Sequence, residues 1–588
     1  MLIYKRKQTM TIQKDITYEQ TQHIPKKLVV QNQFLELRKT VLNTLPEKAE
    51  SLILDMPHAK AFVRSFPNQD LYLLIQDIGP EDAVTILSLA SKKQWQYILD
   101  VQSWDKDKLQ IEPLTKWLYL LIQADPERLV KWLFHEEKEF IEYYCAKNIE
   151  VVPLDEGEDN SFLPDHFVTL DGTFYYGTIE ERLSVPLDAD TMAMREDFIK
   201  DFFSRLANLD YEQYQNFVNE IRGINFSESE EELYQRRMSR LQETGFLPFD
   251  EAIGIYHPVK DNEWKQKQPK FKFFNVSGYP KNVPYYTNIL LDNTSDFSNA
   301  LKQMNYNDYL LFIEEEFAFL CNQIISADLK IIQGKDHLSE VVKKACGYLS
   351  IGLSYIIQTT DFKKFQQVLV HYPLQDIFRI GYSCALQLKW KAEKWRNSCW
   401  FLQAGFSLKF WDELWVGVLG GLFLKKPLYY NQLNDGLLFK EFQTLEEIHT
   451  TETQLNEIIA MDQVLSLFSV SIKPNKSNFR TYVTYKNVLL TLWCRSFLKR
   501  PVELSPISKN DFTQFFNQLW DSSASQRQIS LEMKQSFMAF IQSQTQLIEY
   551  EIMQKIGPTL DSLFNEIELE YQSITTIDPR FIVLFLLE

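Results

Sequence analysis

The sequence predicts a mainly α protein with an N-terminal α-α superhelical repeat, a middle region with one β-hairpin, and a C-terminal aromatic-rich helical domain. Two observations carry this prediction. Apolar residues recur at helical spacing along most of the 588 residues, whereas glycine, with 18 residues, is scarce. In addition, short segments return almost unchanged at a spacing of about 46 residues, a period typical of helical repeats.

The N-terminal repeat is the clearest regularity. The segment Leu-Tyr-Leu-Leu-Ile-Gln at residues 71–76 returns unchanged at residues 118–123. An interleaved echo, Ile-Leu-Asp, occupies residues 53–55 and 98–100. Because each repeat must bury its apolar face against the next one, we expect residues 28–150 to fold as a stack of short helices.

Prolines separate the short helices of this region. Pro80-Glu81 and Pro126-Glu127 each follow one copy of the hexapeptide, and a proline at the first helical position loses no hydrogen bond. Such helices joined by Pro-Glu turns resemble the superhelical cytosolic domain of bacterial magnesium transporters and related flagellar-switch modules. The resemblance implies a fold and no transport, since the sequence has no pore segment. Equivalent copies would bury both Leu74 and Leu121.

A middle region follows at residues 151–257. Residues 167–170 and 173–176 have the composition of strands, and Asp171-Gly172 between them predicts a hairpin over 167–176 with a two-residue turn. Helical spacing then resumes, and Gly245 is expected to end the helix before it.

A family resemblance rests on the residues around that helix end. Residues 240–246, Arg-Leu-Gln-Glu-Thr-Gly-Phe, are followed by Glu251-Ala252 and Tyr256. This block resembles a signature of an uncharacterised bacterial family seen mainly in sulfate- and metal-reducing lineages. Further blocks that resemble the same family are 71–107, 378–382, 420–422 and 426–427. The resemblance spans residues 30–500 and implies no activity.

The same block supplies the candidate polar cluster: Arg240, Glu243, Glu251 and Tyr256. An arginine three residues before a glutamate on a helix, with a second carboxylate nearby, predicts an ion pair that fixes this corner of the fold. A ligand-binding role for the cluster is the alternative.

Three further segments complete the domain prediction. Residues 1–27 are polar and are expected to form a mobile arm, and residues 258–292, rich in lysine and proline, are expected to form a linker. Residues 293–588 show helix after helix, with tryptophans concentrated in residues 377–430. The apolar run at residues 581–587 should be buried.

Composition excludes several classes of protein. A net charge of −17 argues against nucleic-acid binding through phosphate contacts. The polar residues 11–22 supply no apolar core for a signal peptide, and no window reaches 18 uncharged apolar residues, so we expect a cytoplasmic location without membrane insertion. The six cysteines include no Cys-x-x-Cys pair and are expected to be reduced.

No short motif predicts catalysis, a cofactor or a metal. His135 with Glu136 begins like a zinc-protease helix, but the second histidine four residues on is absent. His135, Glu139 and Glu142 would share one face of a continuous helix and are the first ligands to consider if a metal were present. P-loop, nucleophile-elbow and kinase motifs are absent as well. We therefore predict no catalytic, cofactor-binding or metal residues.

The function predicted best is a non-catalytic interaction scaffold or regulatory adaptor, because helical repeats recognise partners over an extended face. An enzyme with a pocket between helical domains is the alternative. Convergent polar side chains in a deep apolar pocket would favour the enzyme, and an exposed patch on the repeat would favour the scaffold. The sequence predicts a protein partner without identifying it, and it leaves the oligomeric state open.

Overall fold

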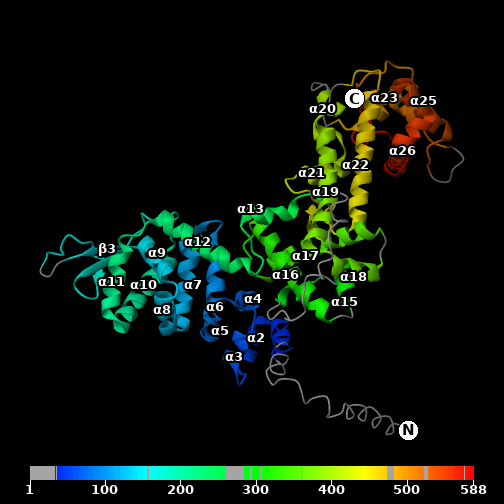
Figure 1. The fold of residues 1–588 in the computed structure, drawn as a ribbon. Coiled ribbons are helices and arrows are strands. Elements are labelled where there is room, and N and C mark those ends of the chain that lie inside the picture. Colours follow the sequence, from blue (N-terminus) through cyan, green and yellow to red (C-terminus); the bar gives the residue numbers. More distant parts are fainter. Residues whose placement is uncertain are drawn as a thin grey trace, which may run out of the picture. The chain divides into compact units, whose positions relative to one another are not determined.

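The computed structural model describes residues 34, 36–154, 158–259, 284–291, 295–304, 307–332, 334–358, 361–472, 483–521, 527–574 and 576–588 (Figure 1). Contacts within the chain divide it into two compact units. Unit 1 comprises the described residues of 1–255, 270–293 and 303–345, and unit 2 those of 256–269, 294–302 and 346–588. The predicted arm and residues 260–283 of the predicted linker lie outside the described residues. The proposed domain boundaries remain predictions.

Short helices build the first part of unit 1. They are α2 (Pro46–Leu54), α3 (Ala59–Arg64), α4 (Asn68–Ile78), α5 (Val84–Leu89), α6 (Lys92–Gln102), α7 (Ile111–Ala124), α8 (Pro126–His135) and α9 (Lys138–Asn148). Helix α2 packs on α4, α4 on α6, and α5 on α7, so helices that alternate along the chain are neighbours in space. Figure 1 shows them as a series of blue to cyan helices.

Both copies of the repeated hexapeptide are helical, the first in the middle of α4 and the second in the C-terminal half of α7. Leu74 is 2% exposed and Leu121 is 0% exposed. The structure thus confirms that both segments are helical and that both leucines are buried. The second echo is less symmetrical, because Asp100 is buried in α6 whereas Asp55 caps α2 and is exposed.

The predicted hairpin at 167–176 is present but differs in two respects. Strands β4 (Val168–Thr169) and β5 (Phe174–Thr178) pair antiparallel, and β3 (Ile149–Pro153), which the sequence did not predict, pairs with the other edge of β5. The connection is longer than two residues, because the Asp171 Oδ1 atom accepts hydrogen bonds from the backbone N–H groups of residues 173 and 174, each at 2.9 Å. Outside the middle region, two short hairpins that the sequence analysis did not predict form at β1 (Trp104–Asp105) with β2 (Lys108–Leu109) and at β6 (Tyr429–Tyr430) with β7 (Phe439–Lys440).

Further helices of unit 1 follow: α10 (Ala189–Leu209), α11 (Tyr211–Ile221), α12 (Phe226–Gln242), α13 (Phe249–Ala252), α14 (Tyr286–Ile289) and α16 (Asn307–Asp328). Helix α12 packs on α9 and α6, and α13 packs on α16. Gly245 follows α12 with φ +91°, and a Cβ atom there would lie 2.8 Å from the Phe319 Cα atom. Only glycine therefore allows the chain to reverse so close to α16.

Unit 2 is helical and rich in aromatic contacts. Its elements are α15 (Asp296–Lys302), the second half of α17 (Lys335–Ile357), α18 (Phe362–His371), α19 (Leu374–Arg396), α20 (Trp400–Gln403), α21 (Glu413–Leu422), α22 (Leu445–Ser466), α23 (Tyr485–Phe497), α24 (Lys509–Gln518), α25 (Leu531–Thr545) and α26 (Glu549–Tyr571). The rings of Trp395, Phe401 and Trp411 contact one another, with centroids 5.3–6.2 Å apart. The mainly α class and the aromatic-rich C-terminal helices are confirmed.

The C-terminal apolar run is buried in part. Ile582, Leu584, Phe585 and Leu586 are buried, whereas Phe581 and Val583 are exposed. Such alternation is that of an extended segment, and the Leu586 N–H group donates to the Thr491 hydroxyl at 3.0 Å. The alternation holds over residues 581–584, whereas the consecutive residues 584–586 are buried on both faces of the segment.

Candidate functional site

The predicted polar cluster does not assemble around Arg240. The guanidinium of Arg240 instead binds the carboxylate of Asp100 on α6 through two hydrogen bonds, Nε to Oδ2 at 2.8 Å and Nη2 to Oδ1 at 2.7 Å. Glu243 and Glu251 are exposed, and neither forms an ion pair with another described residue. The reason is that the turn at Gly245 carries the chain away from α12 before Glu251.

The fourth predicted residue, Tyr256, belongs to unit 2. Its ring lies 4.7 Å from that of Tyr382, and the Lys426 ammonium lies 4.1 Å from its centre. Tyr256 thus packs against an aromatic ring of unit 2.

Asp100 is the residue that organises the Arg240 contact. Its side chain is buried, and burial raises its pKa while the hydrogen bonds and charge of Arg240 oppose the rise. The Arg237 Nε atom also donates to the Asp100 carbonyl at 2.6 Å, and Glu137 lies 4.0 Å from Arg240. Two arginines one turn apart therefore fasten α12 to α6. The sequence marked Arg240 but gave no sign of which acid it would meet.

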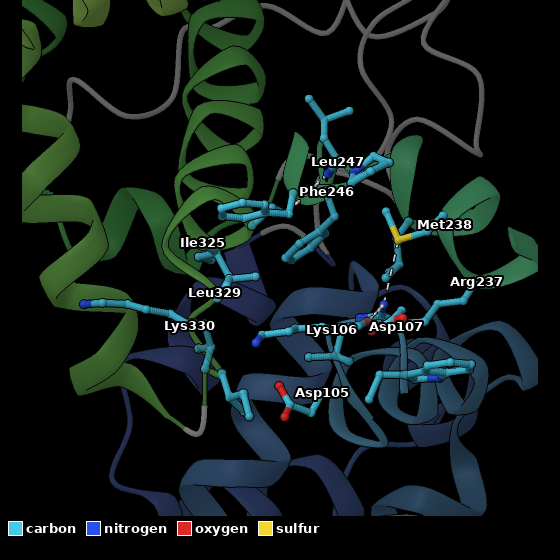
Figure 2. A pocket seen from close by; sticks show the side chains of 18 of the residues that line it. Asp105, Lys106, Asp107, Arg237, Met238, Phe246, Leu247, Ile325, Leu329 and Lys330 are labelled. Carbon is cyan, nitrogen blue, oxygen red and sulfur yellow. Dashed lines mark hydrogen bonds between the residues drawn. The ribbon is translucent and has the colours of Figure 1, made fainter. Parts of the chain in front are cut away.

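A cavity of about 510 Å³ lies beside this contact, entirely within unit 1 (Figure 2). Its walls come from α4, α6, the β1–β2 hairpin, α12, the segment leading into α13, and the end of α16. Its aromatic lining residues are Tyr72, Tyr97, Trp104, Tyr234, Phe246 and Phe249. This size and lining are those of sites that take a small molecule or one large side chain.

Lys106 reaches into this pocket from the tip of the β1–β2 hairpin. In Figure 2 its side chain extends toward the middle of the pocket. Its ammonium forms no hydrogen bond or ion pair with another described residue. Its backbone has φ +57°, in the left-handed region that a residue with a side chain rarely adopts. A free cation is thus held at the cavity by a strained turn.

Leu329 forms part of the opposite wall and is also left-handed, with φ +51°. It follows α16 at the position where glycine usually ends a helix, and the Lys330 N–H group bonds back to the Ile325 carbonyl at 3.1 Å. Lys330 itself points away from the pocket in Figure 2 and pairs with Glu340 at 2.9 Å. A partly exposed leucine therefore replaces the expected glycine.

Gln69 contributes an unpaired acceptor. Its Nε2 atom donates to the Asn322 Oδ1 atom at 3.2 Å, and the orientation of Asn322 is fixed because its Nδ2 atom donates to the Thr244 carbonyl at 2.7 Å. The Gln69 Oε1 atom is buried and has no hydrogen-bond partner. Because a buried acceptor costs free energy when unpaired, a donor on a bound molecule would find a ready partner here.

Three carboxylates, those of Asp105, Asp107 and Asp250, also line the pocket, and most of the remaining polar lining groups are engaged in the fold. Arg237 lies 5.4 Å from the centre of the Trp104 ring and Ser326 accepts a hydrogen bond from the Leu247 N–H group at 3.3 Å. Tyr72 donates to the Ile332 carbonyl, and burial raises its pKa. Among the described lining residues there is no histidine or cysteine.

Two of the residues first considered for a metal, His135 and Glu139, line a separate open groove of about 620 Å³, and the third, Glu142, does not. His135 ends α8 and Glu139 lies in α9, so the continuous helix that would align them is interrupted. Glu139 pairs with Arg236 at 3.0 Å, and Glu142 lies 3.4 Å from Lys138. Burial, together with a hydrogen bond to Glu220, raises the pKa of Glu142 to about 7. Within the described ranges, no three His, Cys, Asp or Glu side chains converge as metal ligands.

A family model described as a family of unknown function (DUF6178) matches residues 27–588. The chain belongs to this family. No curated protein and no solved structure matches the chain, and the likeness to magnesium-transporter domains is not shown by these comparisons. The whole pocket lies inside the segment that defines the DUF6178 family. Where the chain is described, no helix has the length and apolarity to cross a bilayer.

Sequence reasoning missed most of the pocket. Gln69 and Leu329 come from segments more than 250 residues apart and carry no motif. One signal was available at Lys106, because the segment from Trp104 to Leu109 places four charged residues between two apolar ones and contains no glycine for a turn. A turn with a left-handed residue that is not glycine points to a function for that residue.

Proposed function

We propose that the chain is a cytoplasmic, non-catalytic interaction scaffold or regulatory adaptor, and that unit 1 recognises a protein partner by taking one large side chain of that partner into the pocket. The observation that carries this proposal is the free Lys106 ammonium beside an aromatic cavity. Binding sites with few, well-placed polar groups in an apolar lining recognise an anchor residue in this way.

The pocket defines the chemistry of the anchor. An apolar ring matches the aromatic lining, and a donor on that ring would satisfy the Gln69 Oε1 atom. A tryptophan or tyrosine provides both, and these residues dominate protein interfaces. A carboxylate beside the anchor would pair with Lys106. We therefore infer a partner segment with Trp or Tyr next to Asp or Glu.

The two pocket residues with a left-handed backbone, Lys106 and Leu329, support a binding role for the pocket. A left-handed residue other than glycine costs roughly 1–2 kcal/mol, and both Lys106 and Leu329 carry this cost at the pocket wall. Strain at two facing positions is consistent with selection for the side chains themselves. The superhelical resemblance of the N-terminal part is compatible with the proposal, because such modules present an extended face.

Affinity purification from the native cell, with mass spectrometry, tests the proposal when the wild type is compared with three variants. Lys106→Asn removes the cation but tolerates positive φ, Lys106→Arg keeps the charge, and Lys60→Asn removes an exposed lysine away from the pocket. We expect the wild type, Lys106→Arg and Lys60→Asn to retain the partner. Lys106→Asn should lose it. An unchanged partner list with Lys106→Asn, or conversion of a bound metabolite by the wild type, contradicts it.

A further inference from the structure

The interior of the pocket in unit 1 carries a second polar group without a partner. Tyr97 of α6 lines the cavity and is 5% exposed, and its hydroxyl forms no hydrogen bond with another described residue. Burial raises the pKa of this hydroxyl well above its usual value, so the group stays protonated and can donate. The Gln69 Oε1 atom, on the neighbouring helix α4, is a buried acceptor without a partner. One donor and one acceptor therefore line the same aromatic cavity.

The mouth of the pocket carries free charges of both signs. Three consecutive residues of the β1–β2 hairpin, Asp105, Lys106 and Asp107, line the cavity and are exposed. Their charged groups form no hydrogen bond or ion pair with another described residue. In Figure 2 the side chains of Asp105 and Lys106 both point into the pocket. Successive side chains of an extended strand point to opposite faces, so the left-handed backbone of Lys106 is what lets three in a row line one cavity.

Depth separates the two kinds of group and so defines the ligand. Gln69 and Tyr97 are buried, whereas the charges of the hairpin reach solvent. A phenol fits the inner end, because its hydroxyl can donate to Gln69 and accept from Tyr97, whereas an indole N–H can only donate. An α-amino acid head group fits the outer end, because it carries one ammonium and one carboxylate. A cavity of about 510 Å³ has room for such a molecule.

We propose that the pocket binds a free aromatic α-amino acid with a phenol ring, tyrosine, as a regulatory ligand that competes with the partner's anchor residue. The carboxylate of the ligand pairs with Lys106, and its ammonium pairs with Asp105 or Asp107. Its hydroxyl lies between Gln69 and Tyr97. Because the ring occupies the space of the anchor, tyrosine releases the partner. This competition rests on the proposed function, whereas binding of the amino acid needs no partner.

Isothermal titration calorimetry of the full chain with four ligands tests each assigned contact. L-Phenylalanine lacks the hydroxyl, tyramine lacks the carboxylate, and 3-(4-hydroxyphenyl)propionate lacks the ammonium. We expect L-tyrosine to bind 1:1 and L-phenylalanine to bind about tenfold more weakly, because two buried groups stay unpaired. The other two ligands should each bind about fivefold more weakly, because the charge that they lack meets an exposed partner. No binding of L-tyrosine, or equal affinity for L-tyrosine and L-phenylalanine, would overturn the proposal.

Two variants locate the ligand in the pocket. Tyr97→Phe removes a hydroxyl that the fold does not use, and it should weaken binding of L-tyrosine but not of L-phenylalanine. Lys106→Asn should weaken binding of L-tyrosine and leave that of tyramine unchanged. Lys60→Asn, away from the pocket, should change neither. Equal losses of tyramine and L-tyrosine binding in Lys106→Asn would show that Lys106 does not hold the carboxylate, and they would overturn the proposal.

The purification assay separates this inference from the proposed function. L-Tyrosine added to the lysate should displace the partner from the wild type, and L-phenylalanine at the same concentration should displace much less. If L-tyrosine binds but Lys106→Asn keeps the partner, the proposed function is wrong and the amino-acid site stands. If Lys106→Asn loses the partner but L-tyrosine does not bind, the proposed function stands and the amino-acid site is wrong. Binding of L-tyrosine that leaves the partner in place would overturn the regulatory role.

Discussion

In unit 2, the buried carboxylate of Asp462 accepts hydrogen bonds from the Trp395 indole at 3.1 Å and from the backbone N–H groups of Trp400 and Phe401, each at 3.0 Å. In unit 1, Gln69 is just as deeply buried, yet its Oε1 atom has no partner, and the Lys106 ammonium beside the same cavity is free. Asp462 joins α22 to the aromatic core, whereas the Gln69 Oε1 atom and the Lys106 ammonium form no bond that stabilises the fold. Buried polar groups that stabilise the structure are saturated, so unsaturated ones are where a ligand is to be sought.

The largest expected effect on stability is that of a charge placed in the buried core of the helical repeat in unit 1. Leu121→Asp places an unpaired charge in the repeat and should lower the free energy of unfolding by about 4 kcal/mol or more. Leu54→Asp, the same change at an exposed position, should cost less than about 1 kcal/mol. Chemical denaturation of both variants measures the difference. Similar losses in the two would mean that the stack of helices is not the stabilising unit.

Removal of the Asp462 carboxylate should have the next largest effect. Asp462→Ala leaves three donors without an acceptor, and burial of unsatisfied groups costs about 1–3 kcal/mol each, less whatever water recovers, so we expect a loss of about 3 kcal/mol. Near-ultraviolet circular dichroism should change too, because Trp395 and Trp400 lose their anchor. Gln69→Leu in unit 1 is the matched variant. A loss there as large as that of Asp462→Ala would show that Gln69 is structural and would remove the contrast between the units.

Much of the fold could be predicted from sequence because periodicity is a local property. The repeat gave the helices around Leu74 and Leu121 and their burial, and glycine scarcity gave the fold class. The two-residue turn at Asp171-Gly172 was wrong because the Asp171 side chain competes for the backbone donors of the turn. Contacts such as Arg240 with Asp100 were not predictable, since they join segments 140 residues apart. The pocket was not predictable for the same reason, because its walls come from segments far apart in the sequence.

A smaller effect should appear with pH at Asp70, another buried carboxylate of unit 1. It accepts hydrogen bonds from the backbone N–H groups of Tyr285 and Tyr286 at 2.8–3.1 Å, yet burial outweighs them and raises its pKa to about 6. Because the folded state binds the proton more tightly than the unfolded state, its contribution to stability is complete below the unfolded pKa and is lost as the pH rises through 6.

Asp70→Asn tests this dependence. From pH 7 to pH 5 the unfolding free energy of the wild type should rise by about 1 kcal/mol relative to that of Asp70→Asn. Denaturant titrations at the two pH values measure the change, and other groups cancel in the difference. If the difference in unfolding free energy between the wild type and Asp70→Asn stays constant or changes in the opposite direction, the hydrogen bonds from residues 285 and 286 outweigh burial in setting the pKa of Asp70.

The smallest effect on stability is also the sharpest test of the pocket. Lys106→Gly relieves a left-handed strain of roughly 1–2 kcal/mol and costs about 0.5–1 kcal/mol through the greater entropy of the unfolded chain, so the net change in unfolding free energy should lie between zero and a gain of about 1.5 kcal/mol. The same arithmetic applies to Leu329→Gly, apart from the lost contacts of a side chain that is 46% exposed. Thermal denaturation measures both.

If Lys106 and Leu329 serve a partner, the two glycine variants should keep or gain stability while partner retention in the purification assay falls. Lys499→Gly is the matched control, because Lys499 has φ +55° in unit 2, far along the chain from the pocket residues. It should gain stability to a similar extent and retain the partner. A clear loss of stability in Lys106→Gly would mean that its side chain supports the hairpin, and the left-handed backbone of Lys106 would then no longer support a role in binding.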